Sequence, residues 1–128
     1  MVGWVQGGME FGPRALGHRS ILACPGSKQV RDRVNEIKQR AWYRPLAPAV
    51  LAEHAEAYFE GTGDPFMNRT VRIRQQAYSR LAGVTHADGT ARVQTVAAGH
   101  GIFHDLLEEF SRLTGLPVLL NTSLNLKG

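Results

Sequence analysis

A glycine-rich segment, residues 9–20, constrains the fold of this chain most, because its glycines and proline require a loop that leaves the backbone accessible. The segment sets Arg14, Arg19 and the Ser20 hydroxyl among these residues, so few side chains would screen an approaching ligand. Glycine permits close approach of backbone N–H groups, and arginine pairs with phosphate or carboxylate through two parallel hydrogen bonds. The segment therefore predicts a phosphate or acyl-phosphate site. The alternative is a glycine-rich turn with solvated arginines.

Patterns on both sides of this loop alternate between strand and helix. Apolar residues recur at helical spacing, with Ser27 as the expected N-cap of the first helix, and apolar and charged residues alternate in the half-buried strands. The expected strands are 2–6, 19–23, 49–51, 66–74, 91–96 and 118–120, and the expected helices are 27–40, 53–59 and 102–114. The pattern predicts an α/β (α+β) domain, with a twisted mixed sheet and helices packed on it.

Composition limits the class of protein. A chain of 128 residues fits one domain, and 43% hydrophobic with 20% charged residues is typical of a folded, soluble protein. The net charge of +4 suits an anionic small molecule as well as nucleic acid. No apolar run is long enough to span a membrane, and the single cysteine, Cys24, cannot form an internal disulfide. We therefore expect a cytoplasmic protein with no membrane partner.

Several segments, in order along nearly the whole chain, resemble the C-terminal domain of the O-carbamoyltransferases that act on antibiotics and nodulation factors. The resemblance is carried by GWVQGGMEFGPRALGHRSIL at 3–22, RDRVNEIKQR at 31–40, RPLAP at 44–48, PFM at 65–67, THADGTARVQTV at 85–96 and TGLPVLLNTSLN at 114–125. It implies that residues 1–128 are one such domain, a fragment of a longer chain. An N-terminal domain of the parent protein would then bind the acceptor.

A wider resemblance concerns two short pairs. Lys38-x-Arg40 and Ser123-x-Asn125 are similar to the Lys-x-Arg and Ser-x-Asn signature of YrdC-like proteins, which make threonylcarbamoyl-adenylate. The resemblance implies a YrdC-like fold that forms carbamoyl-adenylate from carbamoyl phosphate and ATP. ATP would be a co-substrate, and its phosphates would hold magnesium.

Adenylate formation requires positioning and fixed positive charge rather than a protein nucleophile, because negative charge spreads over the phosphate oxygens in the transition state. Five cations lie inside segments that match the family: Arg14, Lys38, Arg40, Arg44 and Arg92. We predict catalytic roles for Lys38, Arg40 and Arg92, and binding of carbamoyl phosphate by Arg14, Arg44 and Arg19.

Lys38 and Arg40 are two residues apart, so on an ideal helix they would not share a face. They can converge only if the helix ends there. Pro45 and Pro48 favour this ending, because they force an extended segment that would bring Arg44 along the same wall. Ordinary helix-end cations, favoured by the helix dipole, are the alternative.

Ser123 and Asn125 are alternate residues, so on an extended strand they would point to one face and present a hydroxyl and an amide. A polar turn after a buried strand is the alternative. With the resemblance, nucleotide binding is favoured. The residues we predict to bind nucleotide are Met67, Ser123, Asn125, Asn121 and Ser20.

No metal-ligating residue is predicted. Among the histidines, only His100 and His104 have the helical i, i+4 spacing of metal ligands with a third possible ligand nearby, and we interpret this pair as a solvated helix entry rather than a metal site. Two rival functions remain. One is a threonylcarbamoyl-adenylate synthase for tRNA modification, which the matches at residues 12–17 and 88–96 disfavour. The other is a non-catalytic nucleic-acid-binding module that uses Trp42 and Tyr43 among basic residues, although nucleic acid is disfavoured as a partner.

Overall fold

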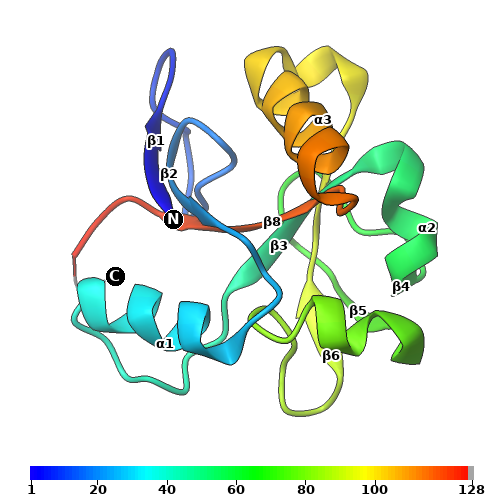
Figure 1. Cartoon of the computed structure of the whole chain (residues 1–128). Coiled ribbons are helices and arrows are strands. Elements are labelled where there is room, and N and C mark those ends of the chain that lie inside the picture. Colours follow the sequence, from blue (N-terminus) through cyan, green and yellow to red (C-terminus); the bar gives the residue numbers. More distant parts are fainter. Residues whose placement is uncertain (127–128) are drawn as a thin grey trace.

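The computed structural model describes residues 1–126, which fold into two sheets and the helices around them (Figure 1). The strands are β1 (Val2–Val5), β2 (Arg19–Ala23), β3 (Ala47–Leu51), β4 (Phe59–Glu60), β5 (Thr70–Ile73), β6 (Thr90–Arg92), β7 (Gln94–Val96) and β8 (Val118–Ser123). The α-helices are α1 (Lys28–Ile37), α2 (Ala55–Tyr58) and α3 (Ile102–Thr114). Short 3₁₀ helices are η1 (Ala52–His54), η2 (Gln75–Arg80) and η3 (Ala98–His100).

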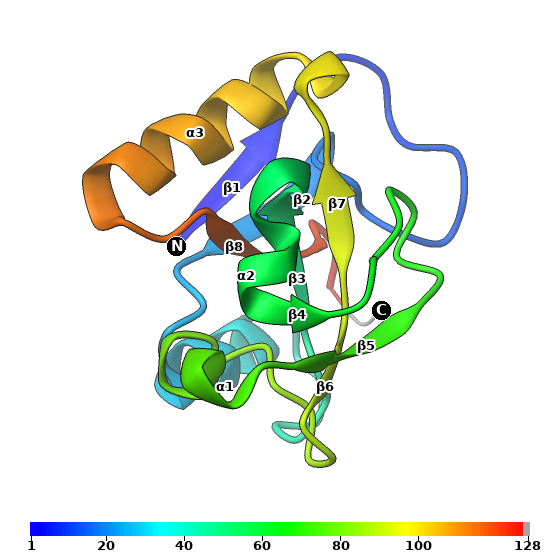
Figure 2. The ribbon, with the colours of Figure 1, turned by 90° about the vertical axis from the view of Figure 1, so that its right-hand side faces the viewer.

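The larger sheet has five strands in the order β1-β2-β8-β3-β7. Its pairs are antiparallel except for β3 and β7, which run parallel, so the sheet is mixed as predicted. Strand β8 is central, and its Asn121 lies opposite Leu22 on one side and Ala47 on the other. The chain passes through β6 in the smaller antiparallel sheet, β4-β5-β6, and then into β7 of the larger one (Figure 2).

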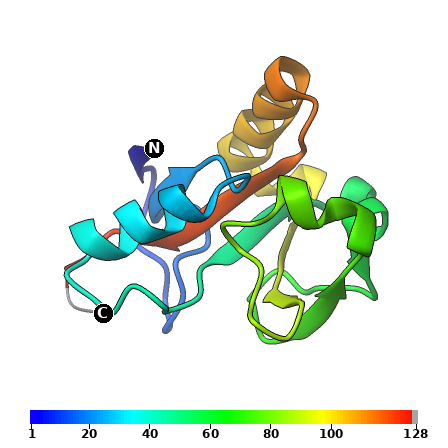
Figure 3. The ribbon, with the colours of Figure 1, turned by 60° about the horizontal axis from the view of Figure 1, so that its bottom comes forward.

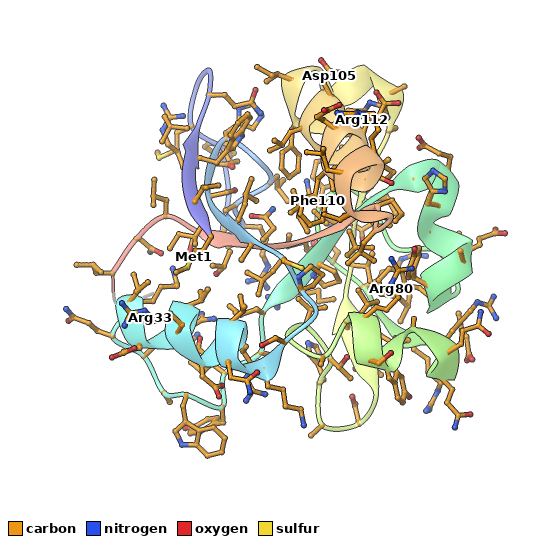
Figure 4. All side chains as sticks on the ribbon, in the orientation of Figure 1. Met1, Arg33, Arg80, Asp105, Phe110 and Arg112 are labelled. Carbon is orange, nitrogen blue, oxygen red and sulfur yellow. The ribbon has the colours of Figure 1, made fainter. Side chains whose placement is uncertain are left out.

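Each face of the larger sheet is covered by a hydrophobic cluster. Helix α3 packs Phe103 and Leu107 against Leu119 and its neighbours on one face. The other face carries Val34 of α1 and the apolar side chains of the smaller sheet. Figure 1 shows α1 and α3 on opposite sides of β8, and Figure 3 shows the smaller sheet and α2 gathered away from the N-terminus. Phe110 of α3 packs against both clusters (Figure 4).

Two helix assignments agree with the sequence pattern. Helix α1 begins after Ser27, whose hydroxyl accepts a hydrogen bond from the backbone N–H of Val30 at 3.4 Å. Helix α3 occupies the predicted range 102–114 and stops at Gly115, which has a left-handed φ of 68°. No helix among the described residues is long and apolar enough to cross a bilayer.

The predicted helix 53–59 divides into η1, α2 and the first residue of β4, and β3 begins two residues before the predicted strand 49–51. Three further strand predictions need correction. Only residues 70–73 of the predicted strand 66–74 form β5, since Met67 has a φ of 57° that interrupts an extended chain. The predicted strand 91–96 breaks at Val93 and contributes to two different sheets. Strand β8 continues to Ser123, three residues beyond the prediction. In each case pairing with distant strands decides the boundary, and that pairing is not a local property of the sequence.

Candidate functional site

A cleft of roughly 590 Å³ brings together most of the predicted site residues. It is lined by parts of the loop between β1 and β2 (residues 6–18, called here the glycine loop), by Arg19 at the start of β2, by Arg40 and residues 44–47, and by the polar end of β8. Arg14, Arg19, Arg40, Arg44 and Arg92 all line it. Glu10 is the only acid among the described residues of its wall. The cleft is therefore strongly positive and suited to an anion.

The glycine loop is fastened at Gly17. This residue has a φ of 101°, and a Cβ there would lie 2.4 Å from the ring of Phe103, so only glycine lets the loop lie against α3. The carbonyl of Gly17 accepts hydrogen bonds from Nε1 of Trp4 at 2.8 Å and Nε2 of Gln6 at 2.6 Å. Its N–H donates to Oγ of Ser20 at 3.2 Å. These contacts fix one end of the loop.

The side chains of Glu10 and Arg19 form hydrogen bonds with the backbone of the same loop. Partial burial opposes ionisation of Glu10, but hydrogen bonds from backbone N–H groups outweigh it and lower the pKa of this carboxyl. Its Oε1 accepts from the N–H groups of Leu16, His18 and Arg19, at 2.8, 2.7 and 3.1 Å. The Arg19 guanidinium donates to the backbone carbonyls of Gln6, Gly7 and His18. Both side chains thus shape the loop.

At the other side of the cleft, α1 ends at Ile37, so Lys38 and Arg40 follow the helix and are not held to helical geometry. Gln39 adopts a left-handed φ of 53°. The N–H of Arg40 donates to the carbonyl of Asn35 at 3.0 Å, and that of Gln39 to the carbonyl of Glu36 at 2.9 Å. This pair of bonds is the Schellman motif, which closes a helix with a left-handed residue. The helix thus ends three residues before the predicted end at Arg40, and of the two cations only Arg40 lines the cleft.

Lys38 is fully buried behind the cleft and does not line it. Its Nζ donates to the backbone carbonyl and Oγ of Ser123, and to the backbone carbonyl and Oδ1 of Asn125, the last two at 2.9 and 2.8 Å. Burial, and then the charges of Arg40 and Arg44, lower the pKa of Lys38 to about 8. The lysine therefore holds the Ser-x-Asn segment in place.

Asn35, which the sequence analysis missed, organises residues 40–45. Its Nδ2 donates to the carbonyls of Trp42 and Arg44, at 2.8 and 3.0 Å, and its Oδ1 accepts from Nε of Arg40 at 2.6 Å. Burial, and then the neighbouring Arg44, lower the pKa of Arg40. A polar residue beside the apolar stripe of α1, next to Val34, was the signal available in the sequence.

A second missed residue, Gln94, ties β7 to the glycine loop through Asn121. Nδ2 of Asn121 donates to the carbonyl of Ala15 at 3.1 Å and to Oε1 of Gln94 at 2.8 Å. Nε2 of Gln94 donates to the carbonyl of Leu16 at 2.9 Å. Both amides are buried, so their hydrogen bonds fix the inner end of the loop against the sheet.

Two buried polar atoms of the cleft have no partner among the described residues: Nε of Arg92, a donor, and Oδ1 of Asn121, an acceptor. Burial, and then the charge of Arg14, lower the pKa of Arg92, which places these two guanidinium groups near each other. Buried polar groups are nearly always hydrogen-bonded in folded proteins. The cleft thus offers an unpaired donor that an anion would satisfy, and an unpaired acceptor that needs a hydrogen-bond donor.

The predicted residues fall into two sets. Those that line the cleft are Arg14, Arg19, Arg40, Arg44, Met67, Arg92, Asn121, Ser123 and Asn125. Lys38 and Ser20 do not line it, because both are buried in hydrogen bonds to the chain itself. Ser123 and Asn125 meet in a turn rather than on an extended strand, since β8 ends at Ser123 and its Oγ donates to Oδ1 of Asn125 at 2.6 Å.

Two features lie outside the cleft. His104 is only 6% exposed, so its interpretation as part of a solvated helix entry is wrong, although His100 is exposed. Its ring and the carboxylates of Glu53 and Glu108 place ligand atoms within 4.8 Å of one another. A second hollow, of roughly 970 Å³, is lined by Trp42 and Tyr43 together with Lys28, Arg31 and Tyr78.

The whole chain, residues 1–128, is matched by the family described as "Carbamoyltransferase C-terminus". The nodulation protein NolO of Bradyrhizobium diazoefficiens is 50% identical over 131 residues, covering 98% of this chain and 24% of that protein. A 3'-hydroxymethylcephem-O-carbamoyltransferase of Amycolatopsis lactamdurans is 49% identical over 130 residues, covering 100% of this chain and 25% of that protein. The chain thus spans about a quarter of the length of these relatives.

Proposed function

The chain belongs to the carbamoyltransferase C-terminus family, and on that basis we propose that its cleft binds carbamoyl phosphate and ATP and forms carbamoyl-adenylate. The relatives whose names state an activity are carbamoyltransferases that act on a hydroxymethylcephem. Because the chain spans only about a quarter of their length, transfer to an acceptor hydroxyl is proposed for a separate N-terminal domain of the parent protein.

The observation that carries this proposal is the unpaired, buried Nε of Arg92 in a cleft with four further arginines and one acid. The acid, Glu10, accepts three backbone hydrogen bonds, and its single negative charge leaves a cleft with five arginines strongly positive. Arg14 and Arg92 repel each other when the cleft is empty, and a phosphate between them would relieve the repulsion. The triphosphate of ATP and the phosphate of carbamoyl phosphate are both anions that arginines can bind in this way.

The proposed reaction has two steps and uses one water molecule. Phosphate leaves carbamoyl phosphate as water adds, which yields carbamate. A carbamate oxygen then bonds to the α-phosphorus of ATP, the bond between the α- and β-phosphates breaks, and pyrophosphate leaves. No protein nucleophile is needed, so positioning and charge stabilisation by Arg14, Arg44 and Arg92 supply the catalysis.

Lys38 has a positioning role in this proposal. It holds Ser123 and Asn125 through buried hydrogen bonds, and these two side chains line the cleft, where they would contact the nucleotide phosphates or ribose. Met67 is 3% exposed and also lines the cleft, so it would supply an apolar contact to adenine. Magnesium would enter with ATP, held mainly by its phosphates.

The proposal is tested by incubating the folded protein with magnesium, ATP and carbamoyl phosphate, and by following pyrophosphate and carbamoyl-adenylate with mass spectrometry. We expect both products only when both substrates are present. The matched control is Arg112→Ala, whose guanidinium pairs with Glu109 on the exposed side of α3, and it should behave like the parent (Figure 4).

Two results would contradict the proposal. One is a correctly folded parent protein that binds neither substrate in calorimetric titrations. The other is release of pyrophosphate that requires threonine and bicarbonate instead of carbamoyl phosphate, which would favour the threonylcarbamoyl-adenylate reaction. Binding of RNA that falls steeply with salt and ignores ATP would instead favour a nucleic-acid-binding function at the hollow of Trp42 and Tyr43.

A further inference from the structure

The amide of Asn121 has one atom that its own chain leaves unused. The residue is 1% exposed, its Nδ2 makes two hydrogen bonds, and its Oδ1 accepts none from the described residues. Asn121 nevertheless lines the cleft, near the point where the glycine loop meets β8. A buried amide oxygen without a donor weakens the folded state unless a ligand supplies the missing hydrogen bond.

The orientation of this amide follows from its neighbours. Oxygen and nitrogen of an asparagine side chain are assigned from the hydrogen-bond network. The carbonyls of Ala15 and Leu16 can only accept, so Nε2 of Gln94 must face Leu16, and Oε1 of Gln94 must face Asn121. The atom of Asn121 that meets Ala15 and Gln94 is therefore the NH₂ group. Its oxygen is left as the acceptor.

The donor that Oδ1 lacks is not provided by the arginines of the cleft, because none of those described donates to it. A ligand that carries an N–H group beside its phosphate would supply this donor while the arginines hold the phosphate. Carbamoyl phosphate has an amino group on the carbonyl carbon that is joined through oxygen to the phosphate. We propose that Asn121 Oδ1 accepts a hydrogen bond from this amino group and so selects carbamoyl phosphate over other acyl phosphates.

The inference rests on the proposed function, and it assigns the two unpaired atoms of the cleft to two ends of one substrate. Arg92 takes the phosphate, and Asn121 takes the amino group. Acetyl phosphate has a methyl group at the same place, which cannot donate. A site built to pair with a polar group rejects an analogue that lacks it, because the protein atom is then left buried and unpaired. Asn121 would thus determine specificity.

Oδ1 is out of contact with solvent, so the substrate must move side chains of the cleft to reach it. Rotamer changes of this kind are common when a ligand binds. The arginines that line the cleft have long, flexible side chains, and their positions are expected to change when an anion binds.

The test is a comparison of two ligands with two proteins. Carbamoyl phosphate and acetyl phosphate are titrated into the parent protein and into Asn121→Leu, which keeps a similar side-chain volume but has neither donor nor acceptor. The substitution also loosens Ala15 and Gln94, but this affects both ligands alike and cancels in the ratio of their affinities. We expect the parent to prefer carbamoyl phosphate by about tenfold or more, and the variant by no more than about threefold.

Ser20→Ala is the matched control. Its hydroxyl accepts a hydrogen bond from Gly17, so its loss also loosens the glycine loop, but Ser20 does not line the cleft. Both affinities should fall together and the preference should remain. If Asn121→Leu does not fold, Asn121→Ala replaces it, since alanine also has neither donor nor acceptor, and the preference for carbamoyl phosphate should again fall to about threefold or less.

The outcomes separate this inference from the function on which it rests. Equal affinity of the parent for the two acyl phosphates overturns the inference and leaves the phosphate site intact. Failure to bind either one overturns the proposed function. A third titration compares ATP with inosine triphosphate, which has an oxygen in place of the adenine amino group. If Asn121→Leu abolishes a preference for ATP and keeps the preference for carbamoyl phosphate, adenine is the partner and the inference is wrong.

Discussion

The end of α1 and the ends of β6 and β8 both bring polar groups to the cleft, but they differ in what those groups bind. At the end of α1, Lys38, Asn35 and Arg40 direct their donors to oxygens of the chain itself. At the strand ends, Arg92 and Asn121 each keep a buried atom without a partner in the described chain. We call these the held group and the open pair. In the proposed function, the first therefore builds the site and the second would meet the ligand.

Residues of one short motif can have different roles in the site. Lys38 and Arg40 stand in the same short motif and both are cations, yet one lies behind the cleft and the other lines it. Residues in a motif can therefore act through their neighbours rather than on the substrate. Stability and ligand affinity, measured on the same variants, distinguish the two roles, and the predictions below use that distinction.

The largest expected effect concerns the support of the glycine loop. Gly17→Ala should lower the free energy of unfolding by about 2–4 kcal/mol, because the added methyl group meets the Phe103 ring and the residue keeps a positive φ. Gly8→Ala is the control, since a Cβ there meets nothing within 4 Å. Urea unfolding measures both. An equal, small effect of the two substitutions would show that the loop is not fastened at Gly17.

The next effect separates the held group from the open pair. Lys38→Met should lower the free energy of unfolding by about 2–3 kcal/mol, because buried oxygens of Ser123 and Asn125 lose a charged donor. Affinity for ATP should fall as a consequence. The measurement is thermal unfolding beside calorimetric titration. Loss of affinity with unchanged stability would show instead that Lys38 contacts the ligand.

Arg92→Met should show the opposite pattern. Removing this guanidinium should weaken binding of carbamoyl phosphate by about 1.5–3 kcal/mol, the contribution of a charge-assisted hydrogen bond. Stability should stay the same or rise, because the variant no longer buries a donor without a partner. Titration and urea unfolding test both halves. A marked loss of stability at constant affinity would show that Arg92 supports the fold and does not contact the ligand.

The most gradual effect is a dependence of stability on pH. In the unfolded chain Lys38 holds its proton up to a pKa near 10.5, whereas in the folded protein it releases the proton near pH 8. The folded state therefore binds fewer protons between these values, and its stability should rise with pH there, by at most about 1.4 kcal/mol per pH unit. The readout is the difference in unfolding free energy between the parent and Lys38→Met from pH 7 to 10. A difference that falls with pH would reverse the sign of this pKa shift.

Sequence periodicity predicted the frame of the fold because the frame depends on local patterns. The apolar stripe and its stop at Gly115 define α3, and Ser27 begins α1, as each does in the structure. The boundary between β6 and β7 was missed, because the break at Val93 arises where the chain passes between two sheets. The left-handed Met67 was missed for a similar reason, since a non-glycine residue gives no local sign of positive φ.

The sequence by itself determined which residue types gather at the site: the arginines, the glycine loop and the polar end of β8 all lie in segments that resemble one family. Only the tertiary structure decided what each of them contacts. The structure shows that Gln94 and Asn35 support the site, and that Lys38 and Ser20 are buried rather than part of the cleft wall. The sequence does not show this, because hydrogen-bond partners far apart in the chain meet only after the sheet has formed. Which polar atoms are paired and which stay open for a ligand is thus a property of packing.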